Sequence, residues 1–381
     1  MRNDEPHVLV IADDITGAAE MAGIAFCQGQ QVRLVCGSPL CCDHVAAQTT
    51  VIATDTRSMS ETEAVAETQK VSFLISHSLF ESVALRTSFL IYKKTDSALR
   101  GHVVAELSAL MKATGYHRAV YLPANPSKGR IIKDGIYYIN NVPIHETDFS
   151  YDPEFPARTS MLRERFPDAE AKGIIMPDAE SEEEIQNVIA KYNDGKTLFA
   201  GAADLFSALL KNYGNIPSDM TTNHGGSPHD THDTLVLCGS TQSKPLNLGI
   251  PTAPMPREIY DGSDDLSLWD TKRYADAHSL ILTMPYMHRT GKEAAVHLRT
   301  MMAEKAKELV AEHCPQHLII EGGATAWATL QALGWTEFTI TAQFAPGVVQ
   351  IKSVTTGTLV TLKPGSYPWG ALNPKASCLE P

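Results

Sequence analysis

Residues 7–12, HVLVIA, form a short, continuous apolar run that ends in two acidic residues, Asp13 and Asp14. Such a run, rich in β-branched side chains, is typical of a buried strand in a parallel sheet. Small and apolar residues follow at helical spacing over residues 16–27, with Thr16 as a candidate N-cap. The opening of the chain therefore predicts a strand and helix of an open α/β sheet.

The same alternation of strands and helices continues through the first half of the chain. Further strands are predicted at residues 31–36, 50–53, 89–92, 118–122 and 197–200, and a hairpin at residues 137–143. Polar clusters follow four of the predicted strands: Asp13 with Asp14, Asp55 with Arg57, Lys94 with Asp96 and Ser97, and Asn125. Because ligands of open α/β sheets bind beyond the carboxyl ends of the strands, we expect a binding site there.

A polar stretch divides the chain into two halves. Residues 216–233 carry prolines, glycines and three histidines, which favours a linker over a metal site. We therefore predict an N-terminal domain of residues 1–215 and a C-terminal domain of residues 234–381. Strands of the C-terminal domain are predicted at residues 234–238, 280–284, 317–321 and 357–362, and helices at residues 292–314 and from 325 to 333.

The bulk composition excludes several classes of protein. The chain has 381 residues and a formal net charge of −12, which argues against nucleic acid or a membrane surface as the main partner. The seven cysteines include no C-x-x-C pair, so neither a disulfide framework nor a zinc site is indicated. The N-terminus lacks the pattern of a signal peptide, and no apolar run approaches the ~20 residues of a membrane span. We expect a cytoplasmic protein, with assembly into a homo-oligomer left open.

Three glycine-containing turns stand at predicted strand ends of the C-terminal domain. They are residues 239–241 (GST), 322–325 (GGAT) and 363–365 (KPG). Glycine lets a backbone approach a phosphate closely, and a helix N-terminus attracts anions. Lys363 could neutralise phosphate charge. Neither a P-loop nor a G-x-G-x-x-G motif is present, and a purely structural role for these turns is the alternative reading.

The strand ends of the N-terminal domain carry acid–base and anion-binding groups. Asp13 and Asp14 suit a general base or Mg²⁺ ligation, although a helix cap with a solvated neighbour is the alternative. Arg57 can clamp a carboxylate with two hydrogen bonds, unless it is simply a surface residue. The segment from Lys94 to Arg100 suits a small anionic polyol through five side chains: Lys94, Thr95, Asp96, Ser97 and Arg100.

Several of these motifs resemble signatures of the four-carbon acid sugar kinase family. They are residues 11–18 (IADDITGA), 55–58 (DTRS), 93–101 (KKTDSALRG) and 141–147 (NVPIHET), followed by Asp152 and Pro153. Members of that family phosphorylate threonate, erythronate or their oxo-forms at the terminal hydroxyl. They bind the sugar acid in the N-terminal domain and ATP in the C-terminal domain.

The resemblance implies a fold, a cofactor and a set of site residues. The fold is α/β with two domains, each a mostly parallel sheet flanked by helices, and with the active site in the interdomain cleft. The implied substrate-binding residues are Asp13, Arg57 and residues 94–97, with Arg57 and Lys94 at the carboxylate. The implied nucleotide-binding residues are Ser240, Gly322, Gly323, Ala324, Thr325 and Gly365. Mg²⁺ would bridge the phosphates of ATP, with no ligands assigned.

Asp13 and Asp96 are the two candidates for the group that orients or deprotonates the attacking hydroxyl. Lys94 and Arg100 should lower the pKa of Asp96 and weaken it as a proton acceptor. Asp14 should raise the pKa of Asp13 by like-charge repulsion. We therefore favour Asp13 as the base and Asp96 as a hydroxyl-positioning or Mg²⁺-linked group.

Two rival functions follow from the same residues. The family has an acidic residue where this chain has Ala324, which motivates a non-catalytic or regulatory sugar-acid-binding protein with a decayed nucleotide site. A kinase for a related, longer sugar acid is the second rival. A measurement of nucleotide binding distinguishes the first rival from the kinase. A panel of sugar acids of different length distinguishes the second.

Overall fold

The computed structural model describes residues 7–37, 47–83, 89–152, 154–213, 233–240, 249–272, 279–285 and 291–365. The chain divides into two compact units, Met1–Met220 and Thr221–Pro381, called here the N-terminal and C-terminal units. The linker predicted at residues 216–233 lies outside the described residues, except for its last residue.

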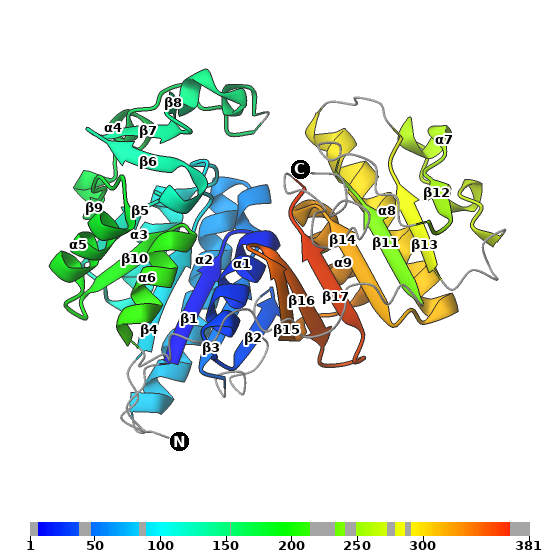
Figure 1. Ribbon diagram of the computed structural model, residues 1–381, viewed down its shortest axis with the longest axis horizontal. Helices are drawn as coiled ribbons and strands as arrows, with labels where there is room; N and C mark the ends of the chain where they lie inside the picture. Colours follow the sequence, from blue (N-terminus) through cyan, green and yellow to red (C-terminus); the bar gives the residue numbers. More distant parts are fainter. Residues whose placement is uncertain are drawn as a thin grey trace, which may run out of the picture. The chain divides into compact units, whose positions relative to one another are not determined.

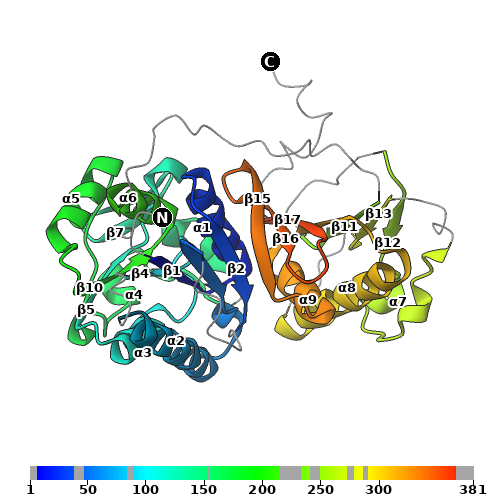
Figure 2. The same ribbon diagram turned by 90° about the horizontal axis from the view of Figure 1, so that it is seen from below.

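The N-terminal unit is built on a parallel sheet. Its described strands lie in the order β2-β3-β1-β4-β10-β5-β9, and every pair among them is parallel. Their bounds are β1 (His7–Ala12), β2 (Val32–Cys36), β3 (Thr49–Ala53), β4 (Phe89–Lys94), β5 (Arg118–Leu122), β9 (Ile174–Ile175) and β10 (Thr197–Gly201). One face is covered by α1 (Ile15–Cys27), α5 (Glu182–Tyr192) and α6 (Ala203–Tyr213), and the other by α2 (Glu61–Val83) and α3 (Val103–Thr114) (Figure 2). The predicted α/β fold with flanking helices is confirmed.

The order of strands reverses between β1 and β4. The chain leaves β1 through α1 towards β2, whereas it leaves β4 through α3 towards β5 on the opposite side. Such a switch point opens a crevice at the carboxyl ends of the two strands. Ala12 and Lys94 are register partners there, so the residues that follow them lie side by side.

The start of α1 differs from the sequence prediction. The helix begins at Ile15 and its N-cap is Asp14, whose Oδ1 accepts a hydrogen bond of 2.9 Å from the amide of Gly17. Thr16 lies inside the first turn and donates to Asp14 Oδ2, so the prediction of Thr16 as the cap was wrong. Asp14 still has the extended backbone of the strand end, and an N-cap requires that conformation.

A small antiparallel sheet covers the strand ends of the N-terminal unit (Figure 1). It consists of β6 (Arg130–Lys133), β7 (Ile136–Ile139) and β8 (Val142–Pro143), which confirms the predicted hairpin. A backbone bridge between Asn125 and Arg130 joins it to the end of β5. Two short 3₁₀ turns follow, η4 (Ile144–Glu146) and η5 (Asp148–Tyr151), and the four-residue helix α4 (Leu162–Arg165) comes next.

The C-terminal unit has a mixed sheet in the order β12-β13-β11-β14-β17-β16-β15. Its described strands are β11 (Thr234–Cys238), β12 (Thr252–Pro254), β13 (Ser279–Thr283), β14 (His317–Glu321), β15 (Glu337–Ala345), β16 (Val348–Ser353) and β17 (Leu359–Lys363). Its described α-helices are α7 (Arg257–Tyr260), α8 (Lys292–His313) and α9 (Gly323–Leu333). The first five strands in this order are parallel, and β16 and β15 continue the sheet in antiparallel pairing. The sequence did not predict β12, β15 or β16.

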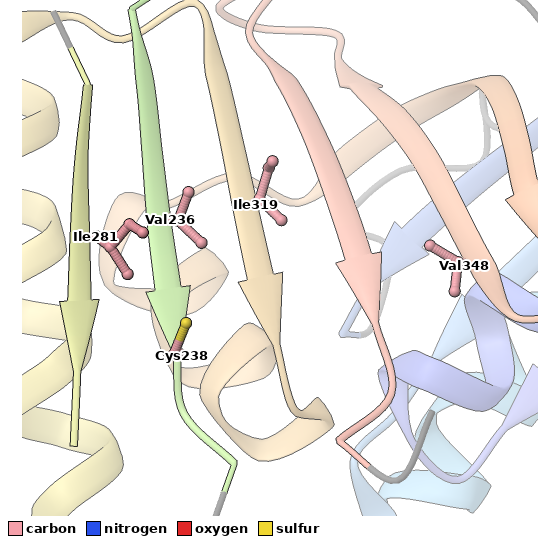
Figure 3. Close-up of a cluster of buried hydrophobic side chains, with 5 residues drawn as sticks. All are labelled: Val236, Cys238, Ile281, Ile319 and Val348. Atoms are coloured by element: carbon pink, nitrogen blue, oxygen red, sulfur yellow. The ribbon is translucent and has the colours of Figure 1, made fainter. Parts of the chain in front are cut away.

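The C-terminal unit has its own reversal of strand order, between β11 and β14. The chain leaves β11 towards β12 and β13, whereas it leaves β14 through α9 towards β15 on the other side. Beneath this point lies a buried apolar cluster (Figure 3): Val236, Cys238, Ile281, Ile319 and Val348. Val236 is in register with both Ile281 and Ile319, so these side chains share one face of the sheet. Among the described helices, none is both long and apolar enough to cross a membrane.

Candidate functional site

Two aspartates and two arginines meet at the crevice between β1 and β4, together with the N-cap aspartate of α1. Asp13 and Asp14 follow β1, and Asp96 follows β4 two residues after its end. Arg57 is carried by the turn η2 (Thr56–Ser58) after β3, and Arg100 lies four residues beyond Asp96. These five residues are called the aspartate–arginine cluster. The structure thus brings together four of the substrate-binding residues predicted from sequence.

Arg57 is the centre of this cluster. Its Nε and Nη2 donate to the two carboxylate oxygens of Asp13 at 3.0 and 2.9 Å, which is the fork geometry of a paired guanidinium and carboxylate. Its Nη1 donates to Asp14 Oδ2 at 3.1 Å and lies 3.6 Å from Asp96 Oδ1. The fork that the sequence assigned to a substrate carboxylate is therefore engaged by Asp13.

Asp96 is held by a second arginine fork and by the backbone. Arg100 donates through Nε and Nη2 to the two oxygens of Asp96 at 2.8 and 3.0 Å. The amides of Ala98 and Arg100 add hydrogen bonds to Asp96 Oδ2. The remaining Nη1 of Arg100 lies 3.5 Å from Asp152 Oδ2, so this guanidinium also has acidic partners on more than one side.

The two aspartates differ in acidity. Burial raises the pKa of Asp13 above its ordinary value, against the lowering effect of Arg57. Burial would also raise the pKa of Asp96, but Arg100 and Arg57 outweigh it and hold that pKa well below the ordinary value. Both directions agree with the sequence prediction. The main cause at Asp13 is burial, however, and the repulsion from Asp14 is a smaller contribution.

Lys94 and Thr95 are buried at the end of β4, beside the aspartate–arginine cluster. The ammonium of Lys94 donates to Thr95 O at 2.9 Å and lies 3.7 Å from Glu20 Oε2. The hydroxyl of Thr95 is buried and has no hydrogen-bond partner among the described residues. A buried hydroxyl without a partner costs free energy, so this group is suited to receive a polar atom of a ligand.

A buried ion pair supports the turn that carries Arg57. Lys93 Nζ lies 2.7 Å from Glu106 Oε2, and the Thr56 hydroxyl donates to the same oxygen at 2.8 Å. Thr56 is the residue before Arg57, so the pair in the sheet interior determines where η2 sits. The sequence did not identify this support because Glu106, on α3, lies 50 residues from Thr56 along the chain.

The small antiparallel sheet of β6, β7 and β8, called here the hairpin sheet, adds residues to the site that were not predicted from the sequence. Arg130 donates to the hydroxyl of Ser97 through Nη1, and Tyr137 donates to the carbonyl of Ser97. The guanidiniums of Arg130 and Arg100 each lie 5.8 Å from the centre of the Phe149 ring. Arg130 was not found from the sequence because the predicted hairpin covers residues 137–143 and does not include β6.

The three predicted glycine turns of the C-terminal unit meet at the ends of β11, β14 and β17. A Cβ on Gly239 would lie 2.0 Å from Thr325 Oγ1, and a Cβ on Gly365 would lie 2.6 Å from Ser240 Oγ. Gly322 has a φ of +94°, which disfavours any residue with a side chain. The side chains of Thr325 and Ser240 therefore leave no room for a Cβ at Gly239 and Gly365, whereas at Gly322 the positive φ is the constraint. We call Gly239, Ser240, Gly322, Thr325 and Gly365 the glycine-turn cluster.

This cluster surrounds the N-terminus of α9. Gly322 is the N-cap, and no side chain caps the helix. The first-turn amides of a helix carry a partial positive charge and suit an anion such as phosphate. Thr325 is buried against Gly239, whereas Ala324 is exposed on the first turn.

Lys363 lies at the end of β17, as the sequence predicts, and its charge already has an acidic partner there. Its side chain is fully buried, and its ammonium pairs with Glu321 Oε1 at 2.7 Å and donates to Pro364 O at 3.1 Å. Its charge is thus balanced by Glu321 at the end of β14. Lys363 links the ends of two adjacent strands and so positions the turns that follow them.

The described residues gather no group of three or more histidine, cysteine or acidic side chains that could hold a metal ion. Mg²⁺ in phosphoryl-transfer enzymes is commonly held by one or two carboxylates together with the phosphates of the nucleotide. The aspartates of the aspartate–arginine cluster are compatible with that mode of binding, whereas the glycine-turn cluster contains no acidic residue.

Two known protein families match separate regions of the chain. Residues 8–173 match the family described as a sugar-binding N-terminal domain, and residues 275–367 match the one described as a nucleotide-binding C-terminal domain. A 3-oxo-tetronate kinase of Brucella melitensis is 26% identical over 409 residues, which cover 94% of this chain and 92% of the relative.

Two further comparisons differ in how much of the chain they cover. A D-threonate kinase of Salmonella typhimurium is 30% identical over 157 residues, covering 41% of this chain and 35% of that protein. The crystal structure of a Haemophilus influenzae protein of the family DUF1537 superposes with a TM-score of 0.69 at 20% identity, covering 97% of this chain and 99% of the other. That structure shows the same fold.

Because both domain matches occur in order along one chain, and one relative is matched over nearly its full length, the chain belongs to the four-carbon acid sugar kinase family.

Proposed function

We propose that the protein is an ATP-dependent kinase that phosphorylates the terminal hydroxyl of a four-carbon sugar acid. Its relatives are named 3-oxo-tetronate, D-threonate and D-erythronate kinases, which supports this class of substrate. The match to a nucleotide-binding domain supports a nucleotide as the phosphoryl donor.

The observation that carries the proposal is the state of Asp13. It is 2% exposed, stands at the switch point of a parallel sheet and has a raised pKa. A carboxylate that is a stronger base than usual can accept or orient the proton of an attacking hydroxyl. Arg57 holds both oxygens of Asp13 and thereby determines the direction in which its lone pairs can point.

The other residues of the crevice are assigned to substrate binding. Asp96 stays ionised and accepts hydroxyl hydrogen bonds while it holds Arg100. The unpartnered hydroxyl of Thr95 and the hydroxyl of Ser97 suit the secondary hydroxyls of a polyol acid. The sequence predicts Arg57 and Lys94 at the substrate carboxylate, but both cations have acidic side chains beside them, so we assign them a positioning role instead.

ATP is assigned to the glycine-turn cluster of the C-terminal unit. The uncapped start of α9 and the close approach of three backbones fit phosphate oxygens, with Ser240 and Thr325 as hydroxyl donors beside them. Mg²⁺ would arrive with the nucleotide and supply charge neutralisation for the transferring phosphoryl group.

A coupled ADP-release assay tests the proposal. The purified chain is incubated with ATP and Mg²⁺ and with threonate, erythronate, 3-oxo-tetronate and a five-carbon acid in turn. We expect turnover with a four-carbon acid and phosphorylation at its terminal hydroxyl, identified by NMR. Release of ADP with none of the acids would refute a kinase of this class. Turnover with the five-carbon acid alone would show that the enzyme is specific for longer sugar acids.

The second candidate function is a sugar-acid-binding protein without kinase activity. Ala324 is the observation that favours it, because this exposed position on the first turn of α9 lacks the acid of the family. Calorimetry with ATP and ADP separates the two functions. Binding at millimolar nucleotide or below favours the kinase, whereas sugar-acid binding with no nucleotide binding favours the alternative.

A further inference from the structure

We propose that Arg130 is the residue that receives the carboxylate of the sugar acid and so makes the site selective for acids over neutral polyols. The proposal rests on the sugar-acid substrate proposed above. It concerns a residue of the hairpin sheet rather than one of the motifs that follow the parallel strands.

The two arginines of the aspartate–arginine cluster already have carboxylate partners. Arg57 uses Nε and Nη2 on Asp13 and Nη1 on Asp14. Arg100 uses Nε and Nη2 on Asp96, and its Nη1 faces Asp152. A substrate carboxylate that took the Nε–Nη2 fork of either guanidinium would displace an aspartate and leave a buried carboxylate uncompensated, at considerable cost.

Arg130 differs from both in its partners. Among the residues that the structure describes, no carboxylate lies within ion-pair distance of its guanidinium. Its side-chain hydrogen bond goes to the neutral hydroxyl of Ser97, a residue predicted to contact substrate. A guanidinium has five N–H donors, so most of those on Arg130 are left for a ligand.

The position of Arg130 is well defined by its surroundings. Its backbone forms the bridge with Asn125 at the end of β5, through hydrogen bonds of 2.7 and 3.2 Å. The ring of Phe149 supports the guanidinium from the side. An arginine held in this way loses little conformational freedom when it binds, which favours a strong and directional contact.

The charge around Phe149 points to an anion. The guanidiniums of Arg130 and Arg100 flank the same ring at 5.8 Å from its centre, and only the charge of Arg100 is balanced by nearby carboxylates. A planar carboxylate could form two hydrogen bonds with Arg130 and balance its charge. The opposite end of a four-carbon chain would then extend along Ser97 and Thr95 towards Asp13.

The test compares the acid with its neutral isostere. Arg130→Gln, Arg130→Lys and the control Arg163→Gln are made in the full chain, Arg163 being an exposed residue of α4 outside the site. Calorimetry measures the affinity of each variant for threonate and for threonamide, in which an uncharged amide replaces the carboxylate. ADP-release kinetics with threonate give kcat and KM separately.

We expect Arg130→Gln to weaken threonate binding by about 10- to 100-fold, the range for losing a charge-assisted contact, and to leave threonamide binding within about twofold. Arg130→Lys should recover part of the loss, and Arg163→Gln should match the parent. KM for threonate should rise far more than kcat falls, because the contact is present before and during transfer.

Three results would overturn the assignment of Arg130. They are threonate affinity in Arg130→Gln equal to that of the parent, an equal loss for threonate and threonamide, and a parent that binds the two ligands equally well. Failure of the kinase proposal gives a different result, because the parent would then release no ADP with any acid in the panel. Selective binding of threonate could still be measured in that case.

Discussion

Replacing Asp13 by asparagine removes the proposed base while the size and shape of the side chain are kept. In the structure Asp13 accepts two hydrogen bonds from Arg57, at 3.0 and 2.9 Å. Asparagine retains one acceptor oxygen and turns an NH₂ group towards the other donor. The loss of one charge-assisted hydrogen bond costs about 1.5–3 kcal/mol of stability. Removal of a buried charge offsets part of that loss, so we expect Asp13→Asn to remain folded.

The expected effect on catalysis is larger than the effect on folding. Loss of a general base reduces kcat by at least ~100-fold, which corresponds to about 2.7 kcal/mol of transition-state stabilisation. Affinity for the sugar acid should change little, because Arg57 keeps its contacts with Asp14 and Asp96. The matched variant Asp96→Asn should lose affinity instead, because it releases the fork of Arg100.

The pH profile provides a second measurement of the same assignment. Burial raises the pKa of Asp13 above 3.8, so its ionised form accumulates only as the pH rises through that higher value. The kcat of the parent should increase with pH over this window, and Asp13→Asn should lose that dependence. The same raised pKa means that ionisation of Asp13 lowers the stability of the fold as the pH rises through it.

The assay is ADP release at saturating sugar acid, with calorimetry for substrate affinity and thermal unfolding as a control for folding. A folded Asp13→Asn with kcat within a few-fold of the parent would refute the role of Asp13 as base. A loss of kcat alone in Asp96→Asn, together with a loss of binding in Asp13→Asn, would exchange the two roles and leave the kinase proposal in place.

Three further predictions concern the supports of the two clusters. Arg57→Lys keeps the positive charge but loses the paired hydrogen bonds to Asp13, so the pKa of Asp13 should rise and the acid limb of the kcat–pH profile should move to higher pH. An acid limb at the same pH as in the parent would show that Arg57 does not set the pKa of Asp13. Because the pKa of Asp96 is lowered in the fold, its ionisation stabilises the protein above the unfolded pKa of about 3.8, and this contribution is lost as the pH falls. Urea unfolding should therefore show that the stability of Asp96→Asn depends less on pH below pH 4 than the stability of the parent does. An unchanged pH dependence of stability would contradict this. Gly239→Ala should raise KM for ATP and cost about 1–3 kcal/mol of stability, because its Cβ would lie 2.0 Å from Thr325 Oγ1. Since Cβ of Thr325 would itself be 2.7 Å away, a second change Thr325→Gly should restore more stability to Gly239→Ala than Thr325→Ala does, and equal recovery would argue against this packing.

Local patterns were sufficient for the elements that make up most of each sheet. The run at residues 7–12 became β1 with the same bounds, and Ser60 and Glu63, spaced as S-x-x-E, form a capping box at the start of α2. Continuous apolar strands and short-range caps depend on neighbours within a few residues, so the sequence contains their cause. The antiparallel strands β15 and β16 were missed because their stability depends on partners in the sheet rather than on a continuous apolar run.

The sequence alone determined which residues stand at the strand ends: Asp13, Arg57, Asp96, Gly239 and Gly322. It could do so because the carboxyl ends of parallel strands share one edge of a sheet, whatever the length of the connections between them.

Only the tertiary structure decided how those side chains are paired. It places the fork of Arg57 on Asp13, the charge of Lys363 on Glu321, and Arg130 of the hairpin beside Ser97. These contacts join residues that are distant along the chain, and the energy of each depends on burial and on distances of a few ångströms. Neither quantity is contained in the order of the residues, because both arise only when the strands pack side by side.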